Sequence, residues 1–244
     1  MEVCKATWDE VRDFCKKCDL AIVPCGVVET KGYHQPMATD AILSEELAKR
    51  IAERVEALVA PTITVGVAAA GARAFPGSLQ VSPNVFRDYV REICDWLVFW
   101  GFKRFLFISA HGPNGAPLAE VASYLKGEHS ARCAYIQFNP FYTAFAEDLV
   151  VSETPFGHAG EAEASIMLHW RPDLVKMDKA VNYQPKPTSS VPGLEKFVDY
   201  EYDFGYLSET GHWGDPTVAT AEKGAEIEKR MLDFLEKFIQ EELS

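Results

Sequence analysis

The chain has 244 residues, of which 48% are hydrophobic and 25% are charged, as is usual for a soluble globular protein. Its 36 acidic and 24 basic residues give a formal net charge of -12. This charge argues against nucleic acid and against an anionic membrane as partners, because both attract basic faces. No basic segment followed by an apolar run opens the sequence, and no apolar stretch is long enough to span a membrane. We expect a single domain over residues 1–244.

Six cysteines lie at positions 4, 15, 18, 25, 94 and 133. Cys15 and Cys18 form a CxxC pair, but neither a second pair nor a Cys/His pair follows at the spacing of a zinc finger. The residues around the pair have the pattern of an amphipathic helix. We therefore expect reduced thiols without disulfides, in a cytoplasmic protein.

Short apolar runs alternate with helical patterns along the chain. In chain order, the patterns predict a strand at 20–25, a helix at 41–56, a strand at 57–62, a helix at 84–100, a strand at 104–109, a helix at 116–127 and a strand at 133–138. Further helices are predicted at 161–169 and 218–241, whereas residues 180–216, rich in Pro, Gly, Tyr and Asp, are expected to be irregular. In the helix at 84–100, one face carries Val85, Tyr89, Ile93 and Trp96.

This alternation predicts an α/β fold with three layers, αβα, in which a mostly parallel sheet is flanked by helices, because parallel strands need crossover connections. The run at 104–109 is almost entirely apolar, as expected for a strand that is buried on both faces. In such sheets the ligand lies beyond the carboxyl ends of the strands. The loops that follow the predicted strands are therefore where the chemistry is expected.

The loop after the first predicted strand carries Glu29, Lys31, His34 and Asp40. Taken alone, Asp40 could cap the helix that follows, and Glu29 could be a solvated loop residue. The loop after residues 104–109 adds His111, which the sheet would bring close to the first loop. Carboxylate and imidazole ligands of this kind suit Zn, Mn or Fe.

A third group of candidates follows further along the chain. His158 lies in a loop, and Glu161 and Glu163 begin a predicted helix, where both carboxylates also suit the helix dipole. Any one of these residues has an ordinary structural explanation. Their significance depends on whether the fold brings the three groups together.

Five motifs occur in order between residues 20 and 230. They are Pro24-Cys-Gly-Val-Val-Glu29 with His34-Gln-Pro and Thr39-Asp40, then Phe75-Pro-Gly-Ser78, Ser109-Ala-His-Gly-Pro-Asn114, the run from His158 to Ser165, and Gly211-His-Trp-Gly-Asp-Pro-Thr217 with Glu222-Lys-Gly224. In type and order they resemble the motifs of the creatininase (creatinine amidohydrolase) family. Five ordered motifs are very unlikely to coincide by chance.

The resemblance implies roles for individual residues. Glu29, Asp40 and His111 fall on metal-ligand positions, and Asp40 falls on the position that bridges two metals in the family. His158 matches the family's active-site histidine and is expected to carry a proton to the leaving group. Substrate contacts are expected from Tyr33, His34, Ser78 and Asn114.

Two residues depart from the family pattern. Lys31 stands where the family has a histidine ligand of the second metal, and Pro113 stands where creatininase has a glutamate. A lysine ammonium group is a donor only and cannot ligate a cation. We therefore expect one metal per chain rather than two. Glu161 or Glu163 could partly replace the missing ligands of the second site. Charged Lys31 is expected to take part in catalysis.

The resemblance leaves three functions open. The first is metal-dependent hydrolysis of a C–N bond in a small cyclic amide or a formamide, with water activated by zinc, manganese or iron. The second is hydrolytic C–C ring opening of a cyclic diketone such as a diketo-inositol. The third is non-catalytic binding of a small molecule. Because relatives are commonly hexameric rings, a homo-oligomer is expected as well.

Overall fold

The computed structural model describes residues 1–154, 156–186 and 203–243. Four parallel strands form one sheet in the order β2-β1-β3-β4, with β1 at Leu20–Cys25, β2 at Leu58–Val59, β3 at Arg104–Ser109 and β4 at Arg132–Gln137. The central strands β1 and β3 are in register along their whole length, so that Cys25 lies opposite Ser109 at their carboxyl ends. Both strand ends therefore open toward the same edge of the sheet.

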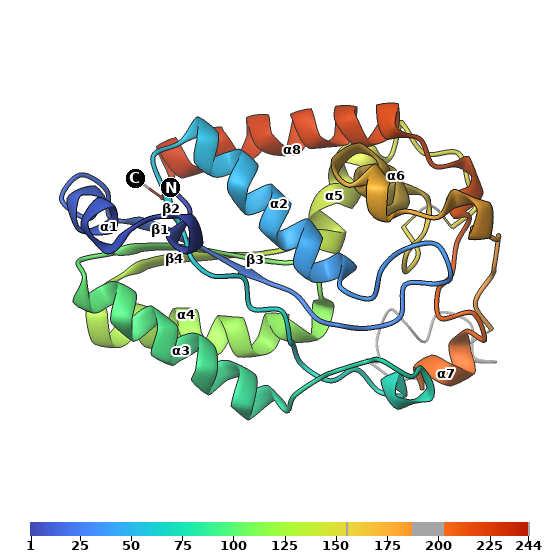
Figure 1. The fold of residues 1–244 in the computed structure, drawn as a ribbon, viewed down its shortest axis with the longest axis horizontal. Helices are drawn as coiled ribbons and strands as arrows, with labels where there is room; N and C mark the ends of the chain where they lie inside the picture. The colour runs from blue at the N-terminus through green and yellow to red at the C-terminus, as the bar shows by residue number, and fades with distance from the viewer. Residues whose placement is uncertain (155, 187–202, 244) are drawn as a thin grey trace.

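Helices cover both faces of this sheet (Figure 1). One face is covered by α2 (Thr39–Arg54), α5 (Phe138–Ala146), α6 (Glu161–Trp170) and α8 (Ala221–Glu241), and the other by α3 (Pro83–Phe99) and α4 (Gly115–His129). Alternate residues of β1 enter different cores: Leu20 and Ile22 pack on the first side, Ala21 and Val23 on the second. The predicted αβα fold with a parallel sheet is confirmed.

Two further α-helices are short, α1 at Trp8–Phe14 and α7 at Phe204–Leu207. The irregular segment predicted at 180–216 lies partly outside the described residues, and its described parts contain α7 and the first residue of a 3-10 turn at Pro216–Val218. All six cysteines are free, and α1 ends before Cys15 and Cys18. None of the helices within the described residues is long and apolar enough to cross a membrane.

The structure differs from the sequence prediction at two elements. The strand expected at 57–62 is only two residues long, since Pro61 has no N–H group for a strand ladder. Helix α5 was not predicted, and it begins at Phe138, directly where β4 ends. Its buried residues Phe138, Tyr142 and Ala146 are four apart, so the helical pattern was present but too short to recognise.

The apolar face predicted for residues 84–100 is not the face that enters the core. Helix α3 buries Phe86, Val90, Cys94 and Leu97, while Val85, Tyr89 and Trp96 are exposed. The helix therefore has two apolar faces, and only one of them has a partner within the described chain.

Candidate metal centre

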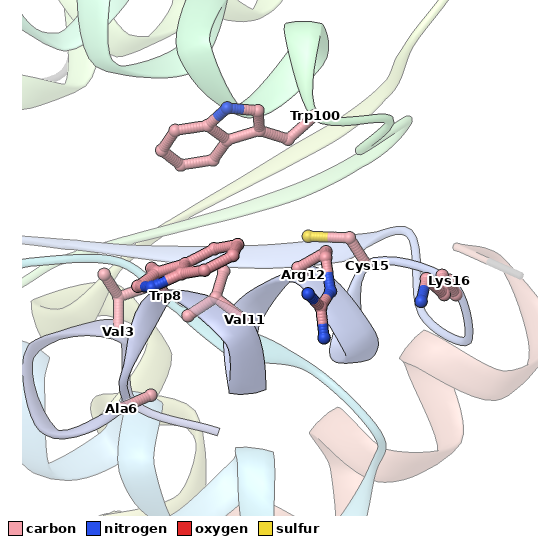
Figure 2. A pocket seen from close by; sticks show the side chains of 8 residues that line it. All are labelled: Val3, Ala6, Trp8, Val11, Arg12, Cys15, Lys16 and Trp100. Atoms are coloured by element: carbon pink, nitrogen blue, oxygen red, sulfur yellow. The ribbon is translucent and has the colours of Figure 1, made fainter.

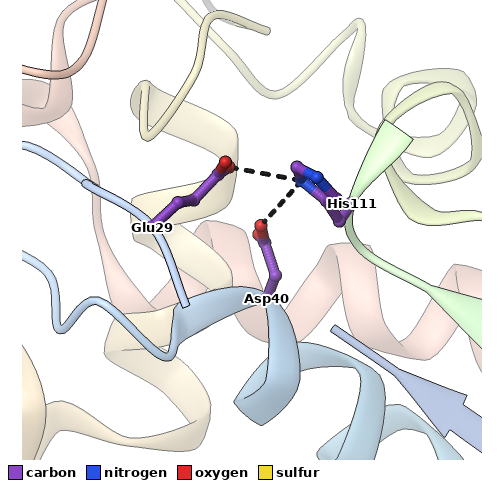
Figure 3. A group of neighbouring side chains, drawn as sticks. All are labelled: Glu29, Asp40 and His111. Carbon is purple, nitrogen blue, oxygen red and sulfur yellow. Dashed lines mark ion pairs between the residues drawn. The ribbon is translucent and has the colours of Figure 1, made fainter. Parts of the chain in front are cut away.

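Glu29, Asp40 and His111 converge at the carboxyl edge of the sheet (Figure 3). All three are buried, and one ligand atom from each lies within 4.8 Å of the others. His111 Nδ1 is 3.4 Å from Glu29 Oε1 and 3.6 Å from Asp40 Oδ2. Two ligands about 2.1 Å from a tetrahedral metal ion are roughly 3.4 Å apart, so the spacing suits a divalent cation.

The fold explains why three residues from two distant segments meet. Glu29 follows β1, His111 follows β3, and these strands are neighbours in the sheet. Asp40 lies in the first turn of α2, not at its cap, which is Ala38. Gly26 lets α2 begin close to the strand end, because a Cβ there would lie 2.3 Å from the backbone of Ala41.

The orientation of His111 leaves one nitrogen free for a ligand. Its Nε2 lies 2.8 Å from the carbonyl oxygen of Val67 and donates to it, which places the lone pair of the neutral ring on Nδ1. Asp40 Oδ2 is buried and accepts no hydrogen bond from the described residues. Burial alone would lower the pKa of His111, but Asp40 and Glu29 raise it to about 9. The carboxylates thus concentrate negative charge around Nδ1, where a divalent cation would displace the proton and bind the freed lone pair.

Lys31 fills the space beside this triad. Its ammonium group is 2.6 Å from Asp40 Oδ1, 3.4 Å from Glu163 and 3.7 Å from Glu29, and the side chain is only 2% exposed. Burial alone would lower the pKa of Lys31, but the three carboxylates raise it above its usual value. The ammonium group is therefore charged, and the Asp40 carboxylate contacts Lys31 with Oδ1 and faces His111 with Oδ2.

His158 lies beside the cluster. Its Nε2 donates to the carbonyl oxygen of Thr30 at 2.7 Å, and its Nδ1 is 3.9 Å from Glu29 Oε1. Phe204 and Trp213 hold the ring, with centroids 4.9 and 5.1 Å away. Burial lowers the pKa of His158 well below its usual value, so the ring is neutral with an accepting nitrogen toward the centre.

The structure does not bring Glu161 to the cluster. Its oxygens accept hydrogen bonds from the backbone N–H groups of Val151 and Ser152, and Lys223 Nζ is 2.5 Å from Oε1. Side chains two positions apart on a helix point about 200° apart, so only one of Glu161 and Glu163 can face the centre. The one that does is Glu163, whose pKa burial raises to about 7 although Lys31 acts against the rise.

Replacing Glu161 with Gln should therefore lower stability and leave metal content unchanged. We expect the free energy of unfolding to fall by about 3 kcal/mol, because a buried charged hydrogen-bonding group is lost. Urea unfolding of Glu161→Gln, Lys223→Met and the double variant measures the coupling between the pair. Loss of metal with stability retained would make Glu161 a ligand after all.

The residues expected to contact the substrate differ in their exposure and in their hydrogen-bond partners. Tyr33 is exposed. The hydroxyl group of Ser78 is buried and has no hydrogen-bond partner among the described residues. His34 is buried and its Nε2 lies 3.0 Å from the carbonyl oxygen of Ala159, a residue in the left-handed region at φ 54°. His34 thus supports the turn that carries His158.

Asn114 is not available to a substrate. Its side chain is completely buried, its Oδ1 accepts from the N–H of Val67, and its Nδ2 donates to the carbonyl oxygen of Gly26. It joins the segments that follow β1 and β2, and hence has a structural role.

Two residues near the centre were missed by the sequence analysis. Gln80 donates to Glu29 Oε2 at 3.4 Å and accepts from the N–H of Ala69, which orients the Glu29 carboxylate. Phe204 packs edge-on against His158. Neither lies in one of the five motifs, so the sequence gave no signal for them.

The parallel αβα fold and the carboxylate–imidazole cluster at the carboxyl ends of its strands place this protein among α/β proteins with a candidate metal site. The family model for creatininase, described as creatinine amidohydrolase, matches residues 5–239. The chain therefore belongs to the creatininase family and is a hydrolase of that family.

Individual relatives support this assignment. The chain is 26% identical to 3-dehydro-scyllo-inosose hydrolase of Thermotoga maritima, over 96% of this chain and 81% of that protein. It is 30% identical to creatinine amidohydrolase of Pseudomonas putida, over 73% of this chain and 75% of that protein. A solved structure described as creatininase Mn shares the fold, with a TM-score of 0.83 and 24% identity over 99% of this chain and 98% of that chain.

Proposed function

We propose that this protein is a metal-dependent hydrolase that cleaves the C–N bond of a small cyclic amide or a formamide. The observation that carries the proposal is the buried convergence of Glu29, Asp40 and His111, with an unpartnered Asp40 oxygen and with Nδ1 of His111 toward the same point. A divalent cation held there would polarise a carbonyl group and acidify water. Its donor set suits zinc, and manganese or iron are alternatives.

Charge balance supports one metal per chain. Glu29, Asp40 and Glu163 contribute three negative charges when ionised, and Lys31 contributes one positive charge beside them. One divalent cation completes neutrality, whereas a second would leave the buried cluster with two excess positive charges. Uncompensated charge in a buried site is costly. The ammonium group of Lys31 therefore takes the place of a second cation.

Two residues beside the triad would take part in the reaction, one by proton transfer and the other by stabilising charge. His158 is neutral, held by Thr30 and its aromatic neighbours, and would take and return a proton at Nδ1. The leaving nitrogen of an amide needs such a proton before the C–N bond breaks. The ammonium group of Lys31 would offset negative charge that develops on the substrate oxygen.

Lys31 also favours a second candidate, hydrolytic C–C ring opening of a cyclic diketone. Breaking a C–C bond leaves an enolate, and a fixed ammonium group stabilises that charge. The relative from Thermotoga maritima, which aligns over 96% of this chain, is named for a substrate other than a cyclic amide. The two candidates share the same triad and differ in the leaving group.

A substrate screen separates the candidates. The purified protein is analysed for bound metal and tested with lactams, formamides and cyclic diketones, before and after chelator treatment and with metal restored. We expect chelator-sensitive hydrolysis of a lactam or a formamide. Turnover of diketones alone establishes the second candidate, and tight metal binding without any turnover contradicts both.

His158→Asn should keep the metal and lower turnover by about 10²- to 10⁴-fold, the usual contribution of acid–base help. The surface variant His129→Asn, which lies far along α4, serves as the control. Metal analysis and turnover are measured on both. If His158→Asn loses its metal, the imidazole is a ligand and the assigned proton transfer is wrong.

A further inference from the structure

Each of the three ligand side chains in the candidate metal centre has a second polar atom, and a neighbour outside the triad engages each of these atoms. Nε2 of His111 donates to a backbone carbonyl group at 2.8 Å. Oδ1 of Asp40 lies 2.6 Å from the ammonium group of Lys31. Oε2 of Glu29 accepts a hydrogen bond from Nε2 of Gln80 at 3.4 Å. These contacts leave each ligand side chain one atom for a cation.

The three remaining atoms face one another (Figure 3). Nδ1 of His111 is 3.4 Å from Oε1 of Glu29 and 3.6 Å from Oδ2 of Asp40. Three protein ligands with an open fourth position are the pattern of catalytic zinc, whereas manganese suits octahedral sites that are rich in oxygen. A carboxylate that binds through both oxygens raises the coordination number. The number of oxygens that Glu29 offers therefore bears on which metal the centre prefers.

We propose that Gln80 is a positioning residue that sets the metal preference of the centre by holding Glu29 to a single ligand oxygen. This inference rests on the proposed metal-dependent function. Because the Gln80 amide engages Oε2, only Oε1 of Glu29 is turned toward His111, and four-coordinate zinc is favoured over manganese. The amide is uncharged, so it controls the coordination number without changing the charge balance of the centre.

Gln80 is itself held in place from the other side of its amide group. Its Oε1 accepts from the N–H of Ala69 at 3.1 Å, which leaves the Nε2 group to face Glu29. The backbone of residues 66–69 is paired in turn with Val81, through two hydrogen bonds of 2.9 Å. The same segment supplies the carbonyl oxygen that accepts from the imidazole ligand. One paired unit thus orients two of the three ligands.

Gln80→Met tests the proposal, because methionine is also unbranched but has no hydrogen-bond donor. The affinities of metal-free protein for zinc and for manganese are measured by competition with a chromophoric chelator. We expect the ratio of zinc to manganese affinity to fall by about 10-fold or more, the usual effect of removing a hydrogen-bond partner of a metal ligand. Gln240→Met, the same change at an exposed position of α8, should keep the wild-type ratio.

Cobalt(II) substitution provides a readout that a purely structural role of Gln80 would not change. Four-coordinate cobalt(II) absorbs visible light far more strongly than six-coordinate cobalt(II). We therefore expect intense visible absorption for wild type and weaker absorption for Gln80→Met, with unchanged circular dichroism. Gln80→His keeps an N–H donor the same number of bonds from the backbone, and should restore both the affinity ratio and the absorption toward wild type.

Thiols also bind zinc, so a cysteine remote from the centre provides a second control. Cys15 lines an apolar groove together with Trp8 and Trp100, at the amino ends of the strands (Figure 2). Cys15→Ser should bind both metals as wild type does. Wild-type protein that takes up neither metal contradicts the proposed function itself, and the role of Gln80 with it. If metal binds but Gln80→Met matches wild type in ratio and spectrum, or Gln80→His behaves as Gln80→Met does, only the role of Gln80 is overturned.

Discussion

Asp40→Asn should remove the bound metal and lower turnover by about four orders of magnitude or more. Asp40 is completely buried, its Oδ2 faces His111 Nδ1, and its Oδ1 faces Lys31. The asparagine side chain has the same shape but carries no negative charge. The bound metal and the ammonium group of Lys31 both lose that charge as a partner. Because the metal brings the pKa of bound water from 15.7 toward about 7, its loss removes the nucleophile near neutral pH.

Asp173→Asn is the matched control, since among the residues that the structure describes Asp173 pairs only with Arg171, in an exposed ion pair. Metal content and turnover are measured for both variants, and circular dichroism checks that both fold. Lys31 keeps Glu163 and Glu29 as partners in Asp40→Asn, so the folded state should survive. An Asp40→Asn protein with a full complement of metal would contradict the ligand assignment.

The layers of the fold could be predicted because local pattern and final environment agree. In β3, Phe105 and Phe107 enter one core and Leu106 and Ile108 the other, which is why the strand reads as a continuous apolar run. The carboxyl-end rule then places the loops of Glu29 and His111 together. Their convergence follows from strand adjacency alone.

Other features depend on contacts that no local pattern encodes. Glu161 and Glu163 are equally suited to the start of a helix, and only the tertiary position of α6 turns Glu163 toward Lys31. Asn114 lies in a motif that suggests a ligand contact, yet its amide group is fully used by Val67, Gly26 and Ser109. For α3, both faces are apolar, so hydrophobicity does not identify the buried one.

The predicted metal stoichiometry depends on Lys31, because its charged ammonium group lies 2.6 Å from Asp40 Oδ1. Its ammonium group contacts Asp40 Oδ1, and the opposite oxygen of that carboxylate faces the ligand cluster. A carboxylate in this position can join two cations, and here one of the two is the side chain of Lys31. Wild type should therefore bind one divalent ion per chain.

Lys31→His should raise the metal content from one toward two per chain, because a neutral imidazole near Asp40 and Glu163 supplies a ligand where the ammonium group supplied charge. Lys31→Met should keep the first metal and lose about 10²-fold or more in turnover, since the three carboxylates then lack one compensating charge. Lys186→His, which changes an exposed pair with Glu209, is the control and should match wild type. Elemental analysis of the three variants and wild type, after exhaustive dialysis, gives the stoichiometry. Two tightly bound metals per wild-type chain would show that Lys31 does not occupy the second site.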